Sequence, residues 1–236
     1  MEQECQPSIK PQSLKFKVIL IISYGRSGST LLQGILNSID GVLIKGENAN
    51  ILYHFYSAYR QLILNQDQHP HAQLPIHPWF GACWLDKDQY LRDVNQLATN
   101  LLLNHATQDR SSIQAFGFKE IRYATLDDPS DYLEFLEQVF PESCFIHLTR
   151  AYNEVAQSQL RKFKKQQFEP SEIQSRLQDF DETIHAFGSL RANYFQIDYS
   201  DVISKDFTAL GNLYSFLGAA FNPLTIEQVL QAKHSY

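Results

Sequence analysis

Short apolar runs alternate along the chain with stretches in which apolar residues recur at helical spacing. Five runs have the length and the continuous apolar character of strands buried on both faces: residues 18–22, 42–44, 115–118, 144–148 and 194–197. Apolar residues at intervals of three and four predict four helices: residues 51–63, 130–140, 173–187 and 207–217. This alternation predicts an α/β fold with a central, mainly parallel sheet flanked by helices.

The helix ends and one long interruption complete this outline. Pro141 and Gly218 each follow a predicted helix, because proline cannot continue a helix and glycine readily caps one. Residues 65–89 show no period and are rich in proline, histidine and tryptophan, as in many lids and substrate-binding loops. We therefore expect a flexible tail over residues 1–15 and one domain over residues 16–236, with a lid or acceptor insertion at about residues 65–89.

Composition and charge narrow the class of partner. The chain has 236 residues, of which 44% are hydrophobic, enough for a sizeable core. Its formal net charge of −6 argues against broad binding to nucleic acid or anionic lipid, because both depend on summed positive charge. The run at residues 18–22 is too short to span a bilayer, and no cationic signal-peptide start precedes it. The sequence predicts a cytoplasmic protein without a nucleic-acid partner or a membrane span.

Neither the cysteines nor the histidines predict a metal site. The three cysteines, Cys5, Cys83 and Cys144, lie far apart and form no CxxC pair, so a disulfide framework or a cysteine zinc site is not expected. The histidines within residues 65–89 fit no standard zinc spacing, and we expect them to be solvated. A reducing compartment is the simplest context for this cysteine usage.

The turn that follows the first apolar run reads YGRSGST, residues 24–30. Gly25 and Gly28 permit close backbone approach, and the hydroxyls of Ser27, Ser29 and Thr30 add donors. Successive N–H groups in such a turn, continued by those of a helix N-terminus as far as Leu31, form a concave surface that favours an anion. Arg26 supplies a full positive charge.

This turn departs from the usual nucleoside-triphosphate loop, GxxxxGK[ST]. In that loop a lysine reaches the terminal phosphates and the next hydroxyl binds magnesium. Here Ser29 stands before Thr30, and the cation is placed earlier, at Arg26. The turn therefore suits one terminal phosphate-like group better than a triphosphate with its metal.

The stretch YGRSGSTLLQGIL resembles the 5′-phosphosulfate-binding loop of the sulfotransferase family, whose donor is 3′-phosphoadenosine-5′-phosphosulfate (PAPS). It is nearest to the branch that reads PRSGTTLL, which includes the tyrosylprotein sulfotransferases. A second family motif, an arginine after a strand and a serine eight positions later that together hold the donor's 3′-phosphate, is matched by Arg150 and Ser158. Further matches follow in the expected order: Glu47 in VLIKGENANIL, Lys119 in AFGFKEIRY and Tyr199 in FQIDYSDV. The resemblance covers about residues 16–220.

The resemblance implies a P-loop NTPase-like three-layer fold and metal-free transfer of a sulfuryl group from PAPS to an acceptor hydroxyl. It implies Glu47 as the general base, Lys119 at the bridging oxygen and Arg26 at the 5′-phosphosulfate as catalytic residues. Lys162, one turn after Ser158, is added to the 3′-phosphate site. The predicted donor-binding residues are Gly25, Arg26, Ser27, Gly28, Ser29, Thr30, Leu31, Arg150, Ser158, Lys162 and Tyr199.

Several assignments remain open at this level. Glu120 and a histidine of residues 65–89 are rivals for the general base, and Arg122 faces either the acceptor or an acidic neighbour. Trp79, Phe80 and Trp84 form either a small satellite core or an apolar floor for the acceptor. The charge run over residues 161–165 is a solvated helix face or attracts an anionic ligand. Lys233 and Ser235 are candidates for closing over the donor.

The acceptor and two other functions also remain open. A carbohydrate, a lipid-like metabolite and a natural product are all compatible with a hydroxyl acceptor. A small-molecule kinase with a divergent phosphate loop would need magnesium and a nucleoside triphosphate. A non-catalytic nucleotide-binding protein of the same fold would bind the donor without turnover.

Overall fold

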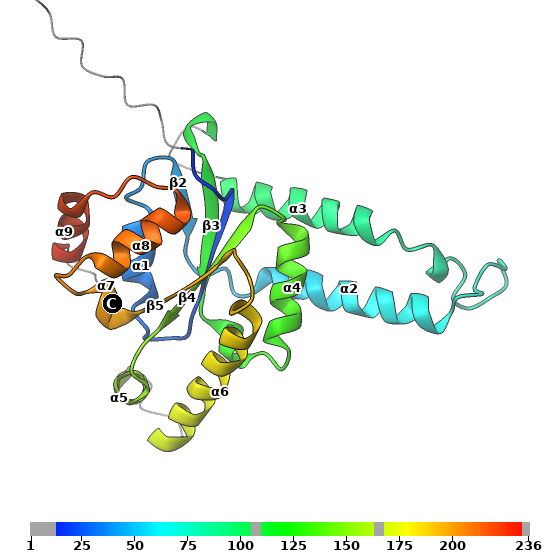
Figure 1. The fold of residues 1–236 in the computed structure, drawn as a ribbon. Helices are drawn as coiled ribbons and strands as arrows, with labels where there is room; N and C mark the ends of the chain where they lie inside the picture. Colours follow the sequence, from blue (N-terminus) through cyan, green and yellow to red (C-terminus); the bar gives the residue numbers. More distant parts are fainter. Residues whose placement is uncertain (1–12, 105–109, 163–167, 233–236) are drawn as a thin grey trace, which may run out of the picture.

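The computed structural model describes residues 13–104, 110–162 and 168–232. Its five strands form one parallel sheet in the order β2-β3-β1-β4-β5 (Figure 1). Their bounds are Val18–Ile22 (β1), Val42–Lys45 (β2), Ala115–Glu120 (β3), Ser143–Thr149 (β4) and Tyr194–Asp198 (β5). All five apolar runs are therefore confirmed as strands. With β1 at the centre, the turn after this strand lies where ligands bind in α/β sheets.

Helices cover both faces of the sheet and make three layers. On one face lie α1 (Ser29–Leu36), α8 (Thr208–Leu217) and α9 (Pro223–Gln231). On the other lie α2 (Ile51–Gln68), α3 (Lys87–Leu103), α4 (Pro129–Val139), α5 (Tyr152–Lys162) and α6 (Pro170–Gly188). The shorter elements are α7 (Tyr199–Val202) and the 3₁₀ helices η1 (Ala82–Trp84), η2 (Arg110–Ser112) and η3 (Arg122–Thr125).

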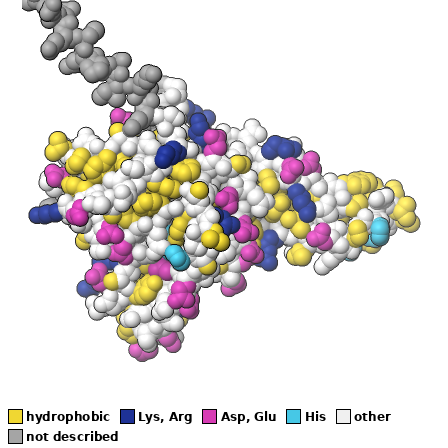
Figure 2. Space-filling model, viewed as in Figure 1, with side chains coloured by type: hydrophobic (Ala, Val, Ile, Leu, Met, Phe, Trp, Pro, Cys, Tyr) yellow, Lys and Arg dark blue, Asp and Glu magenta, His cyan; other side chains and the backbone are white. Residues whose placement is uncertain are grey.

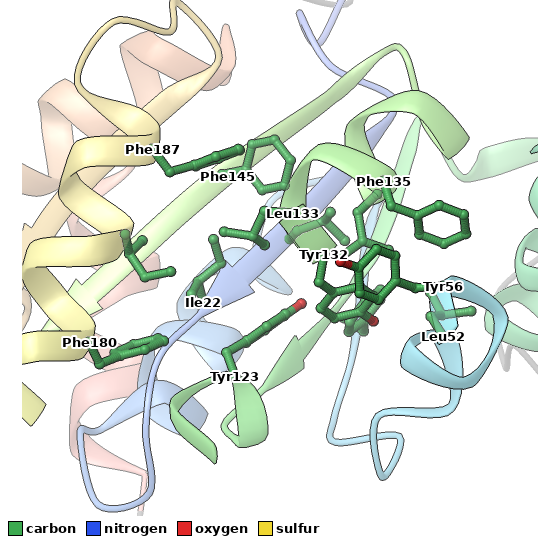
Figure 3. Close-up of a cluster of buried hydrophobic side chains, with 14 of the residues drawn as sticks. Ile22, Leu52, Tyr56, Tyr123, Tyr132, Leu133, Phe135, Phe145, Phe180 and Phe187 are labelled. Atoms are coloured by element: carbon green, nitrogen blue, oxygen red, sulfur yellow. The ribbon is translucent and has the colours of Figure 1, made fainter. Parts of the chain in front are cut away.

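The alternation of side chains along β1 supplies both cores. Ile19 and Ile21 belong to the core under α1 and α8, whereas Leu20 and Ile22 belong to the core under α4 and α6. Figure 3 shows the second core, in which Phe180 of α6 lies near Ile22. A central strand buried on both faces explains why it reads as an unbroken apolar run.

The four predicted helices are present, with corrections. The helix predicted at residues 51–63 is α2, which continues to Gln68. Its buried face is narrower than predicted, because Leu52, Tyr56 and Tyr59 are buried, whereas Ile51 and Leu62 are 43% and 38% exposed. Helix α3 was not predicted, because its buried stripe is limited to Val94, Ala98 and Leu102. The same applies to α9, which buries Ile226.

Helices α2 and α3 form a hairpin that projects from the body of the molecule (Figure 1). Residues 65–68 belong to α2 and residues 87–89 to α3, so the irregular segment is shorter than the predicted 65–89. It forms the tip of the hairpin, far from the sheet, where apolar side chains are exposed (Figure 2). These exposed side chains are Leu74, Ile76, Trp79, Phe80 and Trp84.

Some expectations fall on residues that the structure does not describe. These are most of the tail over residues 1–15, Cys5, Lys164 and Lys165 of the charge run, and Lys233 and Ser235. Among the helices that are described, none has the length and apolar character needed to cross a membrane.

Candidate active site

The turn between β1 and α1 has a backbone that few residues adopt. Arg26 and Gly28 both have positive φ angles, of 74° and 93°. A Cβ atom at Gly28 would lie 2.2 Å from the ring of Tyr199. Glycine is therefore required at this position, both for its conformation and for the close approach of Tyr199.

The N–H groups predicted to bind the anion divide into two sets. The N–H of Ser29 donates to the Ser27 hydroxyl (3.3 Å), and the N–H of Leu31 donates to the Gly28 carbonyl (2.9 Å). The N–H groups of Gly28 and Thr30 have no partner among the described residues. Ser27 is fully buried, so its hydroxyl supports the turn and does not face the cleft.

A cleft of about 370 Å³ opens above this turn, at the carboxyl ends of the strands. It brings together most of the predicted site residues, and Ile121, which the sequence did not suggest, also lines it. Ser27 and Ser158 do not line it. The predicted residues in its lining are Gly25, Arg26, Gly28, Ser29, Thr30, Leu31, Glu47, Lys119, Arg150, Lys162 and Tyr199.

Arg150 follows β4 and joins the two parts of the predicted donor site. Its guanidinium donates to the Arg26 carbonyl (3.1 Å) and lies 4.2 Å from the centre of the Tyr199 ring. The guanidinium also donates two hydrogen bonds, of 3.0 and 2.8 Å, to one carboxylate oxygen of Glu154, which lies four residues later on α5. Glu154 was missed by the sequence reasoning, although its spacing from Arg150 is that of a helical ion pair.

Ser158 on α5 contacts the turn that follows β1. Its hydroxyl accepts a hydrogen bond from Nε of Arg26 (2.9 Å). The structure therefore joins Ser158 to the cation of this turn, and its role at the 3′-phosphate stays a prediction. This contact turns the Arg26 side chain towards α5.

A carboxylate and two cations meet on the β2 side of the cleft. Nζ of Lys119, at the end of β3, lies 2.7 Å from Oε1 of Glu47, which follows β2. Arg122 lies 3.5 Å from the other carboxylate oxygen of Glu47. The Lys119 side chain is only 6% exposed, whereas that of Glu47 is 34% exposed. Glu47 is thus open to a ligand that approaches the cleft, and Lys119 is fixed beneath it.

Glu120, the rival base, is fully buried and saturated with donors. Its carboxylate accepts N–H bonds from Asn50 (3.0 Å), Asn48 (3.2 Å), Ile121 (2.8 Å) and Arg122 (3.2 Å). The Arg122 guanidinium adds a contact of 2.9 Å. Burial alone would raise the pKa of Glu120, but these bonds and the adjacent charge hold it below its ordinary value. Glu120 therefore anchors the turn after β2, and Arg122 pairs with acidic neighbours.

The histidines of the hairpin tip lie away from the cleft. His69 stacks on Trp79, with ring centres 4.9 Å apart, and His77 accepts the N–H of Trp79 through Nδ1. None of residues 65–89 lines the cleft. No group of three or more His, Cys, Asp or Glu side chains in the part of the chain described here is arranged to hold a metal ion.

A buried polar network beneath the cleft was also missed. The Tyr24 hydroxyl contacts Asp181 (3.2 Å) and accepts the N–H of Arg150 (2.9 Å). Asp181 also bonds Nε2 of His147 (2.9 Å), whose Nδ1 meets the Tyr194 hydroxyl (2.8 Å). Burial, reinforced by the charge of Asp181, raises the pKa of Tyr24, so its hydroxyl remains protonated.

The fold and the site together define the class of protein. A parallel sheet, a glycine-bearing turn after its central strand and basic side chains at the neighbouring strand ends are typical of phosphate-loop proteins. A family model described as the sulfotransferase family matches residues 19–223. The chain belongs to this family, and the prediction of a sulfotransferase is confirmed. Dependence on PAPS is the norm of the family.

Solved structures with the same fold agree. The sulfotransferase domain from the curacin biosynthetic pathway has a TM-score of 0.59 and 23% identity, over 92% of this chain and 78% of that one. The sulfotransferase domain from the Synechococcus PCC 7002 olefin synthase has a TM-score of 0.57 and 20% identity, over 98% and 82%. The sulfotransferase from Alicyclobacillus acidocaldarius has a TM-score of 0.52 and 11% identity, over 92% of this chain and 85% of that one.

These likenesses confirm the predicted P-loop NTPase-like fold. A comparison with curated proteins found no match.

Proposed function

We propose that this sulfotransferase moves a sulfuryl group from PAPS to the hydroxyl of a small-molecule acceptor, with Glu47 as the general base and Lys119 as the cation at the leaving oxygen. The observation that carries the proposal is the 2.7 Å contact between Lys119 and Glu47 in the same cleft as the anion-binding turn. A proton acceptor and a fixed cation are the two groups that the transfer requires. Here they stand side by side.

The donor is held at two places in this proposal. The turn, with Arg26 and the N–H groups of Gly28 and Thr30, takes the 5′-phosphosulfate. Arg150 and Ser158 take the 3′-phosphate, and Lys162 and Tyr199 line the same cleft as Arg150. When a phosphate arrives, the guanidinium of Arg150 exchanges its bonds to Glu154 for bonds to the phosphate, which is the stronger partner because it carries more charge.

The transfer is an in-line displacement. The bond between sulfur and the bridging phosphate oxygen breaks, a bond from sulfur to the acceptor oxygen forms, and the hydroxyl proton passes to Glu47. Negative charge develops on the bridging oxygen, where the Lys119 ammonium stabilises it. Because a sulfuryl group carries less charge than a phosphoryl group, we propose that these fixed groups act without a metal ion.

Other parts of the proposal rest on the sequence. The net charge of −6 supports a protein that does not bind nucleic acid broadly. A cytoplasmic location agrees with the scattered cysteines, of which Cys83 and Cys144 are free thiols. A carbohydrate, a metabolite or a natural product each supplies a suitable hydroxyl.

Ligand-induced thermal stabilisation tests the donor. We expect 3′-phosphoadenosine-5′-phosphate (PAP) to raise Tm, because a ligand at one hundred times its Kd adds about 2.7 kcal/mol to stability. ATP with magnesium should give no comparable shift. A shift with ATP and magnesium alone would favour a kinase, and the absence of a shift with PAP would overturn the proposal. Arg150→Ala should remove the PAP shift, whereas Glu47→Gln should keep it.

A further inference from the structure

A second cavity lies beside the cleft, against the turn that joins β2 to α2. Its volume is about 440 Å³, and it lies between the start of α2 and the end of α3. Leu52, Ala98 and Leu102 are its buried residues, and Ile51 and Leu101 are about half exposed where it meets solvent. These five residues make most of its surface apolar, and Lys45, Glu47 and Asn48 add polar groups on the side of β2.

Glu47 connects this cavity to the cleft. Among the described residues, it is the one that lines both. Its carboxylate oxygens contact Lys119 and Arg122 on the side of the cleft. A molecule in the cavity that presents a hydroxyl to Glu47 would therefore place this hydroxyl next to the transferring group.

The order of the strands places the cavity and the proposed donor site at different parts of the sheet. The residues proposed to hold the donor follow β1, β4 and β5, whereas Glu47 follows β2, the edge strand at the opposite side of the sheet. In-line transfer requires the acceptor to approach from the side opposite the leaving phosphate. With the donor held as proposed, an acceptor in the cavity at the β2 edge would approach from that side.

The cavity wall is held in place by the protein itself. Nζ of Lys45 donates to the carbonyls of Asn104 (2.7 Å) and Leu101 (3.3 Å) at the end of α3. A cation at the C-terminal carbonyls of a helix is favourable, so this contact fixes the end of α3 against β2. A pocket formed in advance binds without the cost of ordering its walls.

We propose that this cavity binds the carbon skeleton of the acceptor, and that the acceptor is an alcohol with an apolar body rather than a sugar. Aliphatic or aromatic carbon gains free energy against Leu52, Ala98 and Leu102. Most hydroxyls of a sugar would lose water against this apolar wall without gaining partners, which is costly. The one hydroxyl of such an alcohol can instead meet Glu47 or the buried side-chain amide of Asn48, which has no hydrogen-bond partner among the described residues. This inference rests on the proposed function and names the acceptor class for the same site.

A homologous series of alcohols tests the inference on the unaltered protein. With PAPS as donor, we expect kcat/KM to rise from 1-butanol to 1-octanol by about fourfold for each methylene that becomes buried. Calorimetric titration of the same alcohols in the presence of PAP should show the same trend in Kd. Glucose should be a poorer acceptor than 1-octanol. A constant kcat/KM from 1-butanol to 1-octanol, or an equal kcat/KM for glucose and 1-octanol, would overturn the inference.

A charge at the mouth of the cavity provides the second test. Leu101→Lys should raise KM for 1-octanol at least tenfold and leave the Kd for PAP unchanged. Leu64→Lys on α2 is the matched control, because Leu64 is 47% exposed and Leu101 is 46% exposed, but Leu64 does not line the cavity. An equal rise in KM in both variants, or an unchanged KM in Leu101→Lys, would contradict binding of the acceptor in this cavity.

PAP binding separates the two levels of the proposal. If PAP fails to bind the unaltered protein, the proposed function fails and the acceptor class fails with it. If PAP binds but the alcohol series shows no trend, the proposed function stands and the apolar acceptor is wrong.

Discussion

The hydroxyl of Tyr24, two residues after β1, accepts the backbone N–H of Arg150, the residue that follows β4, at 2.9 Å. The two residues lie 126 positions apart in the chain. One belongs to the turn proposed to hold the 5′-phosphosulfate, and the other carries the guanidinium proposed to hold the 3′-phosphate. This bond therefore sets the spacing between the two halves of the donor site.

Tyr24→Phe should disturb this spacing. Loss of the hydroxyl leaves the Arg150 N–H without its partner and removes one hydrogen bond to Asp181, which should lower the free energy of unfolding by about 1–3 kcal/mol. PAP affinity should fall more than the affinity for adenosine 5′-phosphosulfate, which lacks the 3′-phosphate. Calorimetry measures both ligands. Tyr214→Phe is the control, because its hydroxyl bonds Ile35 elsewhere in the core; it should lower stability alone.

Glu154→Gln should strengthen donor binding. The Glu154 carboxylate occupies the guanidinium of Arg150 and would repel an incoming phosphate. Because this exposed ion pair is worth less than about 1 kcal/mol, we expect a two- to fivefold lower Kd for PAP and little change in Tm. Glu134→Gln removes an equally exposed carboxylate that pairs with Arg191. Identical PAP affinities in the two variants would show that Glu154 does not compete with the ligand.

Gly28→Ala and Gly211→Ala should have opposite effects. At Gly28 the φ angle is 93° and the new Cβ meets the Tyr199 ring, so we expect a loss of more than about 1 kcal/mol and loss of PAP binding. At Gly211, within α8, a Cβ meets nothing within 4 Å, so alanine should stabilise by about 0.5–1 kcal/mol. Chemical denaturation measures both. Stabilisation by Gly28→Ala would contradict the described turn.

Because of Glu120, the free energy of unfolding should decrease at low pH. Its pKa in the folded state lies below the ordinary value near 4.5, so its contribution is fully present above that value and is lost as pH falls through the lowered pKa. Glu120→Gln should be less stable than the unaltered protein at pH 7, by about 1–3 kcal/mol, and the difference should narrow in acid. A difference that stays constant from pH 7 to pH 3 would contradict the account.

The sequence predicted the strands and the neighbourhood of the site for a physical reason. Central strands of a parallel sheet are buried on both faces, and their continuous apolar runs are visible without a structure. Site residues such as Arg26 and Arg150 come within a few residues of the ends of these runs, so the sheet carries them to one edge. Helix α3 was not predicted because only three of its seventeen residues are buried, which gives too weak a helical periodicity to detect in the sequence.

The pairings within the site were not readable from the sequence. Ser158 bonds Arg26 across 132 positions, and Tyr24 meets Asp181 across 157 positions. Such contacts depend on how the ends of side chains meet after the chain has folded, and no local spacing encodes them. The hairpin of α2 and α3 is similar, because its projecting tip follows from helix packing and not from the composition of residues 65–89.

Formation of PAP from PAPS in the presence of EDTA tests the central claim most directly. With a panel of alcohols and sugars as acceptors, the unaltered protein should release PAP together with a sulfated product. Glu47→Gln should bind PAP with the same Kd but react at least one hundredfold more slowly, as expected for loss of a general base. Equal rates for the two proteins, a requirement for magnesium, or PAP binding without any transfer would contradict the account.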